Sequence, residues 1–403
     1  MTFTQRVLER APAATPEVET QTPPEPLPAA PVATSPTPVA QAATLRPSHQ
    51  IADEVSLDRK IGQMVMLGFR GLEVSDQLPI VRDIRMHHLG GVVLFDYDVP
   101  TSSPIRNIQS PAQVKALIAG LQSVASGSLL VAIDQEGGRV RRLKEEHGFP
   151  AAPSPQSLGE ANDVSATYNV ASTIARTLAE HGVNLNFAPV VDLNTNPDNP
   201  IIGKIGRSFS ADPAVVTAHA QAFIRAHHEH GVLCALKHFP GHGSSTADSH
   251  QGFVDITRTW SSAELEPYAS IIKAEQVDAI MTAHVFNATL DPQYPATLSE
   301  PTITGVLRNR LSYDGVVVSD DIQMEAIRQH YGYEAAVAAA IRAGVDIILI
   351  GNNTIYEEDV AGRTVGIIQQ LVRDGKISET RITEAYQRIQ RLKSRIGGAD
   401  SHR

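Results

Sequence analysis

One short segment of the chain combines a cation, three imidazoles and a carboxylate. Residues 237–243 read Lys-His-Phe-Pro-Gly-His-Gly, and residues 248–250 read Asp-Ser-His. An apolar run at 231–236 comes directly before this segment and predicts a buried strand, whereas the glycines and the proline predict an irregular loop after it. Reactive side chains on a loop that a rigid strand holds are typical of an enzyme active site.

The aspartate and the histidine at the end of this segment stand two positions apart. In extended backbone, residues i and i+2 point the same way, so the Asp248 carboxylate can accept a hydrogen bond from His250. Such a contact fixes the tautomer of the imidazole and raises the basicity of its far nitrogen. We expect the pair to protonate a departing oxygen and later to activate water. The alternative is a surface loop whose polarity is accidental.

Another carboxylate, Asp320, follows the apolar run 315–318 and has Asp321 next to it. The two side chains leave the backbone in different directions. We expect Asp320 to be the catalytic carboxylate, which as a nucleophile would form a covalent ester. Residues 321–327 read as the start of a helix, so we expect Asp321 to cap that helix or to support Asp320.

Four charged or polar residues suit a hydroxyl-rich ligand: Asp134, Arg207, Lys237 and His238. A sugar needs donors and acceptors at fixed positions, and charge-assisted hydrogen bonds are short and directional. The alternative for Lys237 and Arg207 is internal ion pairing with Asp134 or Asp192. The two interpretations are compatible with one another.

The histidines also allow a metal hypothesis, since His238, His242 and His250 are possible zinc ligands. Metal-dependent barrel hydrolases typically carry His-x-His at the end of the first strand, where this chain has Gly-Phe-Arg-Gly at 68–71. We therefore favour catalysis without a metal. A non-catalytic sugar-binding barrel is a further alternative, although a binding protein needs neither Asp320 nor an acid/base pair.

Eight short runs rich in Val, Ile and Leu recur along the chain, and segments with helical periodicity separate them. Apolar runs between helices predict parallel strands that are buried on both faces. Eight such repeats predict an α/β fold, a single (β/α)8 barrel of the TIM type. A doubly wound open sheet is the alternative, but it needs a Gly-rich phosphate loop after its first strand. The expected strands are 61–69, 91–95, 129–134, 183–192, 232–239, 279–285, 315–321 and 346–350. The expected helices include 112–124, 165–181, 213–230, 262–275, 333–343 and 377–396.

In such a barrel the active site lies at the carboxyl ends of the strands. Polar residues follow the expected strands at these ends, at 134–139, 192–194, 237–238, 284 and 319–321. A purely structural role explains this convergence of carboxylates, imidazoles and a lysine poorly. We expect Arg139, Arg141 and Arg142, by contrast, to form a solvated face or to anchor loops.

The composition excludes several classes of function. The net charge is −10, which argues against nucleic acid or an anionic membrane surface as the main partner. No apolar run approaches the roughly 18 residues of a membrane span. Cys234 is the single cysteine, so no internal disulfide is possible, and we expect its side chain to be buried. We expect a monomer that acts on a small ligand.

The N-terminal part has a composition of its own, since ten of the 26 prolines lie between residues 11 and 47. We expect 1–48 to be a disordered Pro/Ala/Thr-rich segment, and 49–398 to be one catalytic domain with no second folded domain after it. The first ten residues lack the apolar region of a signal peptide. A Pro-rich tether nevertheless usually joins a domain to an anchor or an export signal. The compartment, cytoplasmic or exported, therefore stays open.

The 237–243 loop and its downstream Asp-x-His resemble the signature of the β-N-acetylhexosaminidases of glycoside hydrolase family 3. Further motifs match in the same order along roughly residues 50–396, and the strongest is Ser-Asp-Asp-Ile-Gln-Met-Glu at 319–325. The supporting matches are 61–64, 131–140, 206–209 and 281–284.

This resemblance implies a retaining, exo-acting enzyme that removes terminal β-linked N-acetylglucosamine. It implies Asp320 as the nucleophile and His250, paired with Asp248, as the acid/base residue. It further implies that no metal or organic cofactor takes part. The implied contacts to the sugar are Asp134, Arg207, Lys237, His238 and Met324.

Two alternatives within the family stay open. The β-glucosidase branch typically carries Ser-Asp-Trp at strand seven and takes its acid/base residue from a second domain. Transfer of the sugar to phosphate is the other alternative, because a histidine acid/base does not repel an incoming anion. Bacterial members commonly act on cell-wall fragments in peptidoglycan recycling. Residues 95–98 and the loop 100–110 depart from the family's pattern, which leaves the identity of the leaving group open.

Overall fold

The computed structural model describes residues 55–250 and 252–396. The segment 1–48, for which the sequence predicts disorder, lies outside these residues. Within the described ranges, no helix is long and apolar enough to cross a membrane. Cys234 is buried, as expected.

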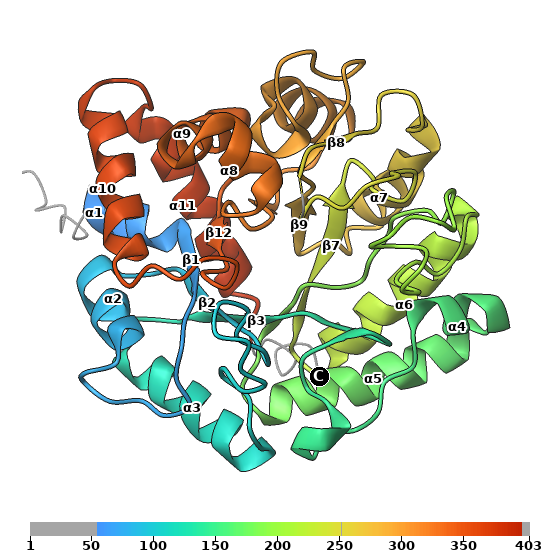
Figure 1. The fold of residues 1–403 in the computed structure, drawn as a ribbon, viewed down its shortest axis with the longest axis horizontal. Coiled ribbons are helices and arrows are strands. Elements are labelled where there is room, and N and C mark those ends of the chain that lie inside the picture. The colour runs from blue at the N-terminus through green and yellow to red at the C-terminus, as the bar shows by residue number, and fades with distance from the viewer. Residues whose placement is uncertain (1–54, 251, 397–403) are drawn as a thin grey trace, which may run out of the picture. The chain divides into compact units, whose positions relative to one another are not determined.

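Eight short parallel strands form the centre of the fold (Figure 1). Every residue in them is buried, which is why they appear in the sequence as continuous apolar runs. The strands are β1 (Val65–Gly68), β2 (Gly91–Leu94), β3 (Leu130–Ile133), β6 (Leu185–Asn186), β7 (Leu233–Phe239), β9 (Ala279–Thr282), β11 (Val316–Val318) and β12 (Ile348–Ile350).

The strands pair with their neighbours in chain order, and β12 returns to pair with β1. A parallel bridge between Val318 and Ile347 joins β11 to the last strand and closes the sheet into a barrel. The backbone N–H of Ser319 also donates to the Ile347 carbonyl oxygen at 2.9 Å. The (β/α)8 architecture predicted from the sequence is therefore confirmed.

Helices surround the strands (Figure 1). Several begin where a capping side chain precedes a proline, as Ser110 and Asp212 do before Pro111 and Pro213. The helices between the barrel strands are α2 (Pro79–His87), α3 (Pro111–Val124), α4 (Pro155–Ala161), α5 (Val164–Glu180), α6 (Pro213–Glu229), α7 (Glu266–Lys273), a π-helix (Pro301–Arg310), α8 (Glu325–Tyr331) and α9 (Tyr333–Ala343), and α10 (Val360–Arg373) follows β12.

The two ends of the barrel chain meet at the amino ends of the strands. Helix α1 (Leu57–Gln63) comes directly before β1, and α11 (Glu379–Lys393) lies next to it. The Lys393 Nζ donates to Gln63 Oε1 at 2.7 Å and joins the two helices. Both helices therefore lie at the end of the barrel opposite to the carboxyl ends of the strands.

Small elements decorate the loops at the carboxyl ends of the strands. After β3, β4 (Gln135–Gly137) and β5 (Val140–Arg141) form an antiparallel hairpin. Farther along the chain, β8 (Val254–Asp255) pairs in parallel with β10 (Val285–Phe286). Short 3₁₀ turns occupy Glu145–His147, Ser262–Leu265 and Ala296–Leu298.

Some predicted boundaries were wrong. The first strand begins at Val65 rather than at 61, because Ile61 belongs to α1 and a short apolar run does not separate a helix from a strand. The helix expected at 262–275 is a 3₁₀ turn followed by α7, which starts one residue before Pro267. The helix expected from Asp321 begins only at Glu325.

Candidate active site

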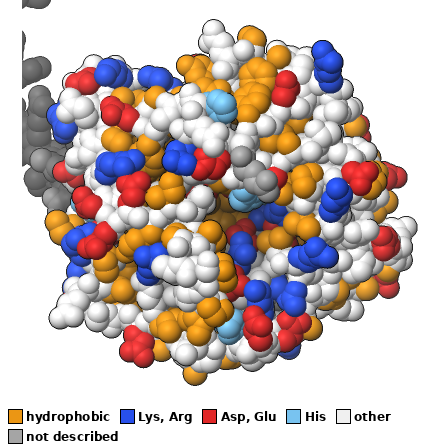
Figure 2. All heavy atoms as spheres, viewed as in Figure 1, with side chains coloured by type: hydrophobic (Ala, Val, Ile, Leu, Met, Phe, Trp, Pro, Cys, Tyr) orange, Lys and Arg blue, Asp and Glu red, His pale blue; other side chains and the backbone are white. Residues whose placement is uncertain are grey.

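A cavity of about 360 Å³ opens at the carboxyl ends of the barrel strands. Figure 2 shows it as a hollow near the centre of this face, with hydrophobic side chains inside and Lys or Arg side chains at its edge. Of the residues predicted for the site, Asp134, Arg207, Lys237, His238, His250, Asp320 and Met324 line the cavity. Asp248 contacts the cavity-lining His250.

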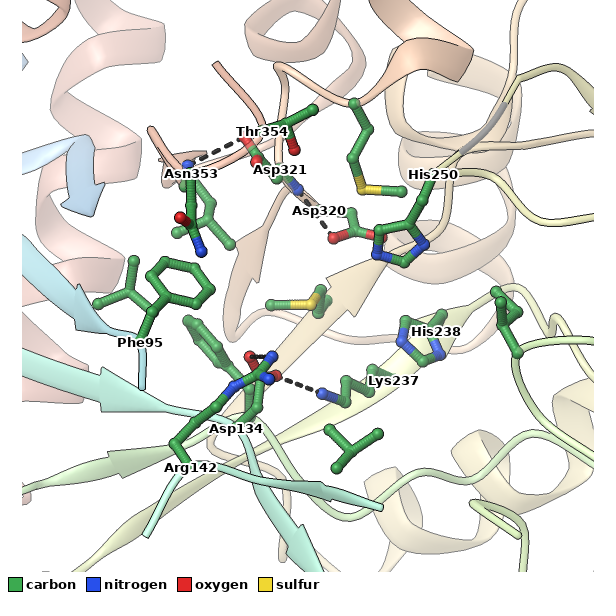
Figure 3. Close-up of a pocket in the computed structure, with 18 of the residues that line it drawn as sticks. Phe95, Asp134, Arg142, Lys237, His238, His250, Asp320, Asp321, Asn353 and Thr354 are labelled. Carbon is green, nitrogen blue, oxygen red and sulfur yellow. Dashed lines mark hydrogen bonds and ion pairs between the residues drawn. The ribbon is translucent and has the colours of Figure 1, made fainter. Parts of the chain in front are cut away.

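A buried lysine holds two carboxylates together on one wall, and Figure 3 shows its ion pair with one of them, Asp134. Lys237 is 2 % exposed, and its Nζ lies 2.7 Å from Asp134 Oδ1 and 2.7 Å from Glu136 Oε1. Burial alone would raise the pKa of Asp134, but Lys237 and Arg142 hold it well below its usual value. The wall therefore presents an ionised carboxylate and an ammonium group side by side.

The partner of Arg207 is Glu136, a residue that the sequence analysis did not single out. The Arg207 Nε donates to Glu136 Oε2 at 2.8 Å and Nη2 donates to Oε1 at 2.7 Å. Although burial would raise the pKa of Glu136, Arg207 and Lys237 lower it. Asp134 and Glu136 stand two positions apart at the start of the extended β4, and this spacing could have indicated that they share a side.

Arg142 also lines the cavity, whereas we expected it in a solvated face or as a loop anchor. The β4–β5 hairpin reverses the chain at Gly137 and Gly138, both of which have positive φ, and returns Arg142 to the site. Its Nη2 lies 3.2 Å from Asp134 Oδ2, and its guanidinium lies 5.6 Å from the centre of the Phe95 ring. Arg141 does anchor the loop, through Glu145 at 2.9 Å.

His238 is fixed from both of its ring nitrogens. Its Nδ1 lies 2.7 Å from Asp192 Oδ2, and its Nε2 lies 3.2 Å from Arg207 Nη2. A guanidinium can only donate, so Nε2 accepts and the hydrogen on Nδ1 is donated to Asp192. Asp192 is fully buried and also accepts the backbone N–H of His242 at 2.8 Å. The ring is therefore held in one orientation at the cavity wall.

The two adjacent aspartates after β11 have different surroundings. Asp320 lines the cavity next to His250 (Figure 3). Burial alone would raise the pKa of Asp320, but the nearby imidazoles, His284 foremost, lower it. Asp321 Oδ1 accepts the backbone N–H groups of Gly351 at 2.9 Å and Gln323 at 3.0 Å. Burial raises the pKa of Asp321 to about 6. Asp321 thus ties β11 to β12 rather than capping α8.

The predicted Asp248–His250 contact is present. His250 Nδ1 lies 2.8 Å from Asp248 Oδ1, which also accepts the His250 backbone N–H at 2.8 Å. Burial lowers the pKa of His250, but the hydrogen bond to Asp248 and the charge of Asp320 outweigh it, so the pKa is raised. The imidazole therefore retains a proton to a higher pH than a free histidine.

The first half of the loop that carries this pair packs closely against Leu193, in the segment that follows β6. A Cβ on Gly243 would come within 1.7 Å of the Leu193 carbonyl oxygen. The Glu264 side chain accepts the backbone N–H groups of Leu193 and Ser244, both at 3.2 Å. Burial raises the pKa of Glu264 to about 8. The glycine and the carboxyl group together fix the position of the loop relative to the barrel.

The loop after β2 forms another wall of the cavity, in the region where the sequence departs from the family's pattern. Asp98 fastens it through Arg70 at 2.7 Å and through Arg106. The hydrogen bond from Arg70 lowers the pKa of Asp98. Asn353 holds the same loop, since its Oδ1 accepts the Val99 N–H at 3.1 Å. Tyr97 and Val99 line the cavity from this loop.

His242, one of the three possible zinc ligands, is engaged with two serine hydroxyl groups. His242 Nδ1 lies 2.7 Å from Ser245 Oγ and its Nε2 lies 3.3 Å from Ser249 Oγ. Among the residues that the structure describes, no group of three or more His, Cys, Asp or Glu side chains is placed to hold a metal ion.

Comparisons with known proteins place the chain in a family. The sequence pattern described as the glycosyl hydrolase family 3 N terminal domain matches residues 56–392. A beta-hexosaminidase of Tolumonas auensis is 37 % identical over 295 residues, which cover 72 % of this chain and 83 % of that protein. The beta-hexosaminidase A of Pseudoalteromonas piscicida is 34 % identical over 390 residues and 87 % of this chain.

Two solved structures extend the comparison. A family 3 beta-N-acetylglucosaminidase from a Paenibacillus species superposes with a TM-score of 0.78 at 37 % identity and covers 87 % of this chain. A beta-N-acetylhexosaminidase from Beutenbergia cavernae gives a TM-score of 0.75 at 30 % identity, over 85 % of this chain and 99 % of the other. The present chain spans 63 % of the Pseudoalteromonas protein and 64 % of the Paenibacillus protein. Since the family pattern matches almost the whole described barrel, the chain belongs to glycosyl hydrolase family 3.

Proposed function

We propose that the protein is a retaining, exo-acting β-N-acetylhexosaminidase that releases terminal β-linked N-acetylglucosamine. The observation that carries this proposal is the position of Asp320 beside the Asp248–His250 pair, at one end of a cavity whose other end holds Asp134 and Lys237 (Figure 3). The names of the relatives favour an N-acetylglucosaminide over a glucoside. Peptidoglycan fragments that end in the same sugar fall within the proposal.

The polar wall would bind the hydroxyl groups of the terminal sugar. Asp134 and Lys237 pair with each other and both contribute to the cavity surface. Arg142, Arg207 and His238 line the same surface, so a ring placed there meets donors and acceptors at fixed positions. Met324 supplies an apolar contact.

In the first chemical step, a carboxylate oxygen of Asp320 attacks the anomeric carbon and forms an ester bond to the sugar. The bond from that carbon to the leaving oxygen breaks, and His250 gives its proton to this oxygen. In the second step, His250 takes a proton from water, and the resulting hydroxide oxygen displaces Asp320. Two displacements at one carbon retain its configuration. Asp248 keeps the imidazole oriented throughout.

The charge states support these roles. The pKa of Asp320 is lowered, so its carboxylate is ionised at neutral pH, as a nucleophile must be. The pKa of His250 is raised, which favours the protonated form that the first step consumes.

Phosphate in place of water would complete the second step equally well. Release of free sugar or of sugar phosphate distinguishes hydrolysis from phosphorolysis.

The experiment that tests this function compares p-nitrophenyl β-N-acetylglucosaminide with the corresponding β-glucoside, using wild type and Asp320→Ala. We expect turnover of the N-acetyl substrate, and a loss on the order of 10³-fold or more in the variant. Near-normal activity of Asp320→Ala would end the nucleophile assignment. Preference for the glucoside would move the protein to the other branch, and binding without turnover would indicate a sugar-binding barrel.

A further inference from the structure

Exposed hydrophobic side chains are concentrated around the cavity. In the part of the chain that the structure describes, the large hydrophobic side chains that are exposed are Met86, Tyr97, Val99, Ile105, Phe253 and Tyr294. All of them except Met86, which belongs to α2, lie in loops that follow the carboxyl ends of barrel strands. Scattered exposed hydrophobic residues need no explanation, but a group beside one site indicates binding.

Two of these residues belong to a row of aromatic rings. The Phe253 ring lies 5.3 Å from that of Phe286 and 5.4 Å from that of His330, measured between ring centres. The row continues from His330 to Tyr331 at 6.4 Å and from Tyr331 to Tyr294 at 5.8 Å. Phe253 is 43 % exposed and Tyr294 is 38 % exposed. The segments after β7 and β9 and the helix α8 thus contribute to one surface, which we call the aromatic row.

The aromatic row adjoins the cavity through two elements. Phe253 follows the cavity-lining His250 by three positions, and Met324, which also lines the cavity, is the residue that precedes α8. His330 and Tyr331 end this short helix. Figure 2 shows hydrophobic side chains gathered over the region where Figure 1 places β8 and α8, on the same face of the molecule as the hollow. The row therefore lies on the face into which the cavity opens, beyond His250 and Met324.

The leaving group of a glycoside must also lie on the His250 side. His250 donates to the leaving oxygen in the proposed mechanism, whereas Asp134 and Lys237 bind the far hydroxyls of the terminal sugar. The wall that carries Tyr97 is tied to this hydroxyl-binding end, since Asp96 lies 3.6 Å from the Arg142 guanidinium that also contacts Asp134. The exposed hydrophobic residues thus form two groups, one in the loop after β2 and one in the aromatic row. The aromatic row is the group on the side of the leaving group.

The chemistry of the row fits neutral sugar residues. Aromatic side chains offer flat apolar faces, while tyrosine hydroxyls and the imidazole offer polar edges. The row contains no fixed charge, so it offers nothing to an anionic group. It is also held in place before any ligand binds: Asp291 Oδ1 accepts the Tyr294 N–H at 3.1 Å, and the Tyr331 hydroxyl donates to the Gln293 carbonyl oxygen at 3.4 Å. Such preorganisation lowers the entropic cost of binding.

We propose that Phe253, Phe286, Tyr294, His330 and Tyr331 bind the sugar residues on the leaving-group side of a β-linked N-acetylglucosamine oligosaccharide. The enzyme then favours substrates longer than a disaccharide, because their additional sugars reach the row. This inference rests on the proposed function, and it adds the class of leaving group and the residues that select it.

The test measures kcat/KM for p-nitrophenyl β-N-acetylglucosaminide and for the di-, tri- and tetrasaccharides of β-1,4-linked N-acetylglucosamine. Wild type should become more efficient as the substrate lengthens. Tyr294→Ala and Phe253→Ala should each lose about tenfold on the tetrasaccharide, the effect of losing one aromatic contact, mainly through KM. Tyr294 is the sharper variant, because its loop contributes nothing to the cavity lining. Circular dichroism of each variant reports correct folding.

Met86→Ala is the matched control, since Met86 is 66 % exposed on α2. This substitution should leave kcat/KM unchanged for the aryl glycoside and for the oligosaccharides. Equal wild-type efficiency at every length would overturn the proposal, as would an unchanged length dependence in both aromatic variants. A length dependence that Tyr97→Ala removes instead would place the leaving group at the other wall. The proposal would also be overturned if kcat/KM increased when an anionic peptide was attached to the substrate and did not increase when sugars were added. An inactive wild type on the aryl glycoside would contradict the proposed function itself, which is a separate result.

Discussion

The proton on His250 is held by two carboxylates, Asp248 through a hydrogen bond and Asp320 through its charge. Because the pKa of His250 is raised, the acid form survives to higher pH and is lost as the pH rises through that pKa. The pKa of Asp320 is lowered, so its carboxylate is lost only as the pH falls through a value below the ordinary one. The activity should therefore have an acidic limb from Asp320 and an alkaline limb from His250.

Replacing Asp248 by Asn should move the alkaline limb to lower pH, because a neutral amide stabilises the imidazolium less than a carboxylate does. The acidic limb should stay in place, since Asp320 is unchanged. The measurement is the pH profile of kcat/KM for wild type and Asp248→Asn. An alkaline limb that does not move would show that Asp248 does not set the proton affinity of His250.

Replacing His250 by Ala should affect substrates according to their leaving groups. An unactivated disaccharide should lose about 10²- to 10⁴-fold in kcat, the usual contribution of a general acid. A p-nitrophenyl glycoside should lose much less in the first step, because its leaving oxygen needs no proton. The comparison uses both substrates with one enzyme preparation, and equal losses on both would count against an acid role.

The stability of the site depends on Glu136, which is the partner of both Arg207 and Lys237. Glu136→Gln should destabilise the protein by about 3–5 kcal/mol, because it leaves two buried cations without their shared counter-charge. The free energy of unfolding in urea measures the effect. Glu146→Gln is the control, since Glu146 is exposed and lies 3.9 Å from Lys144, and it should change the stability little.

At the scale of elements, the loop after β7 owes its position to close backbone contact with Leu193, in the segment that follows β6. Gly243→Ala would place a methyl group where the Leu193 carbonyl oxygen now lies, so the loop must move away from the barrel. A displacement of about 1 Å in a catalytic group can cost about 100-fold in rate. We expect a loss of that order in kcat on a disaccharide, with the fold retained by circular dichroism.

The control for this loop is Gly366→Ala in α10, where a Cβ would meet nothing within 4 Å. Alanine in a helix interior should stabilise the protein by up to about 1 kcal/mol and leave the activity unchanged. A Gly243→Ala enzyme as active as Gly366→Ala would show that the loop tolerates displacement. The close contact with Leu193 would then have no catalytic role.

The order and type of the elements could be predicted from the sequence because most of the buried strands are apolar runs, although β6 includes Asn186 and β7 includes Lys237 and His238. The placement of Asp134, Lys237 and Asp320 on one cavity followed from the rule that strand ends converge. Arg142 and Glu136 could not be placed in this way. The position of Arg142 depends on the β4–β5 hairpin. The role of Glu136 depends on which of two carboxylates, Asp134 or Glu136, pairs with Arg207.

The start of α8 was missed for a related reason. The sequence predicts that Asp321 caps a helix or supports Asp320. Its side chain instead accepts two backbone N–H groups, from Gly351 and Gln323, and the helix begins later. The aromatic row was equally hidden in the sequence. Its rings come from three separate segments, and no local pattern shows that Phe253, Tyr294 and Tyr331 meet.

At the scale of the whole molecule, the distribution of hydrophobic surface bears on assembly. Outside the loops around the cavity, the described surface exposes one large hydrophobic side chain, Met86. A stable interface typically buries about 800 Å² per partner with an apolar centre. We therefore expect a monomer of 43.4 kDa in light scattering. A dimer would contradict this expectation, and its dissociation by long oligosaccharides would place the interface at the aromatic row.

The contact between α1 and α11 has a consequence for immobilising, fusing or circularly permuting this enzyme. The barrel chain starts and finishes at neighbouring points on the face away from the cavity, where Gln63 and Lys393 meet. A short linker between residues 396 and 55 could close the chain into a ring, and new termini could be cut into an outer loop without severing a barrel strand. A support or a fused module joined at residue 55 or at residue 396 would likewise leave the mouth of the cavity on the opposite side of the barrel.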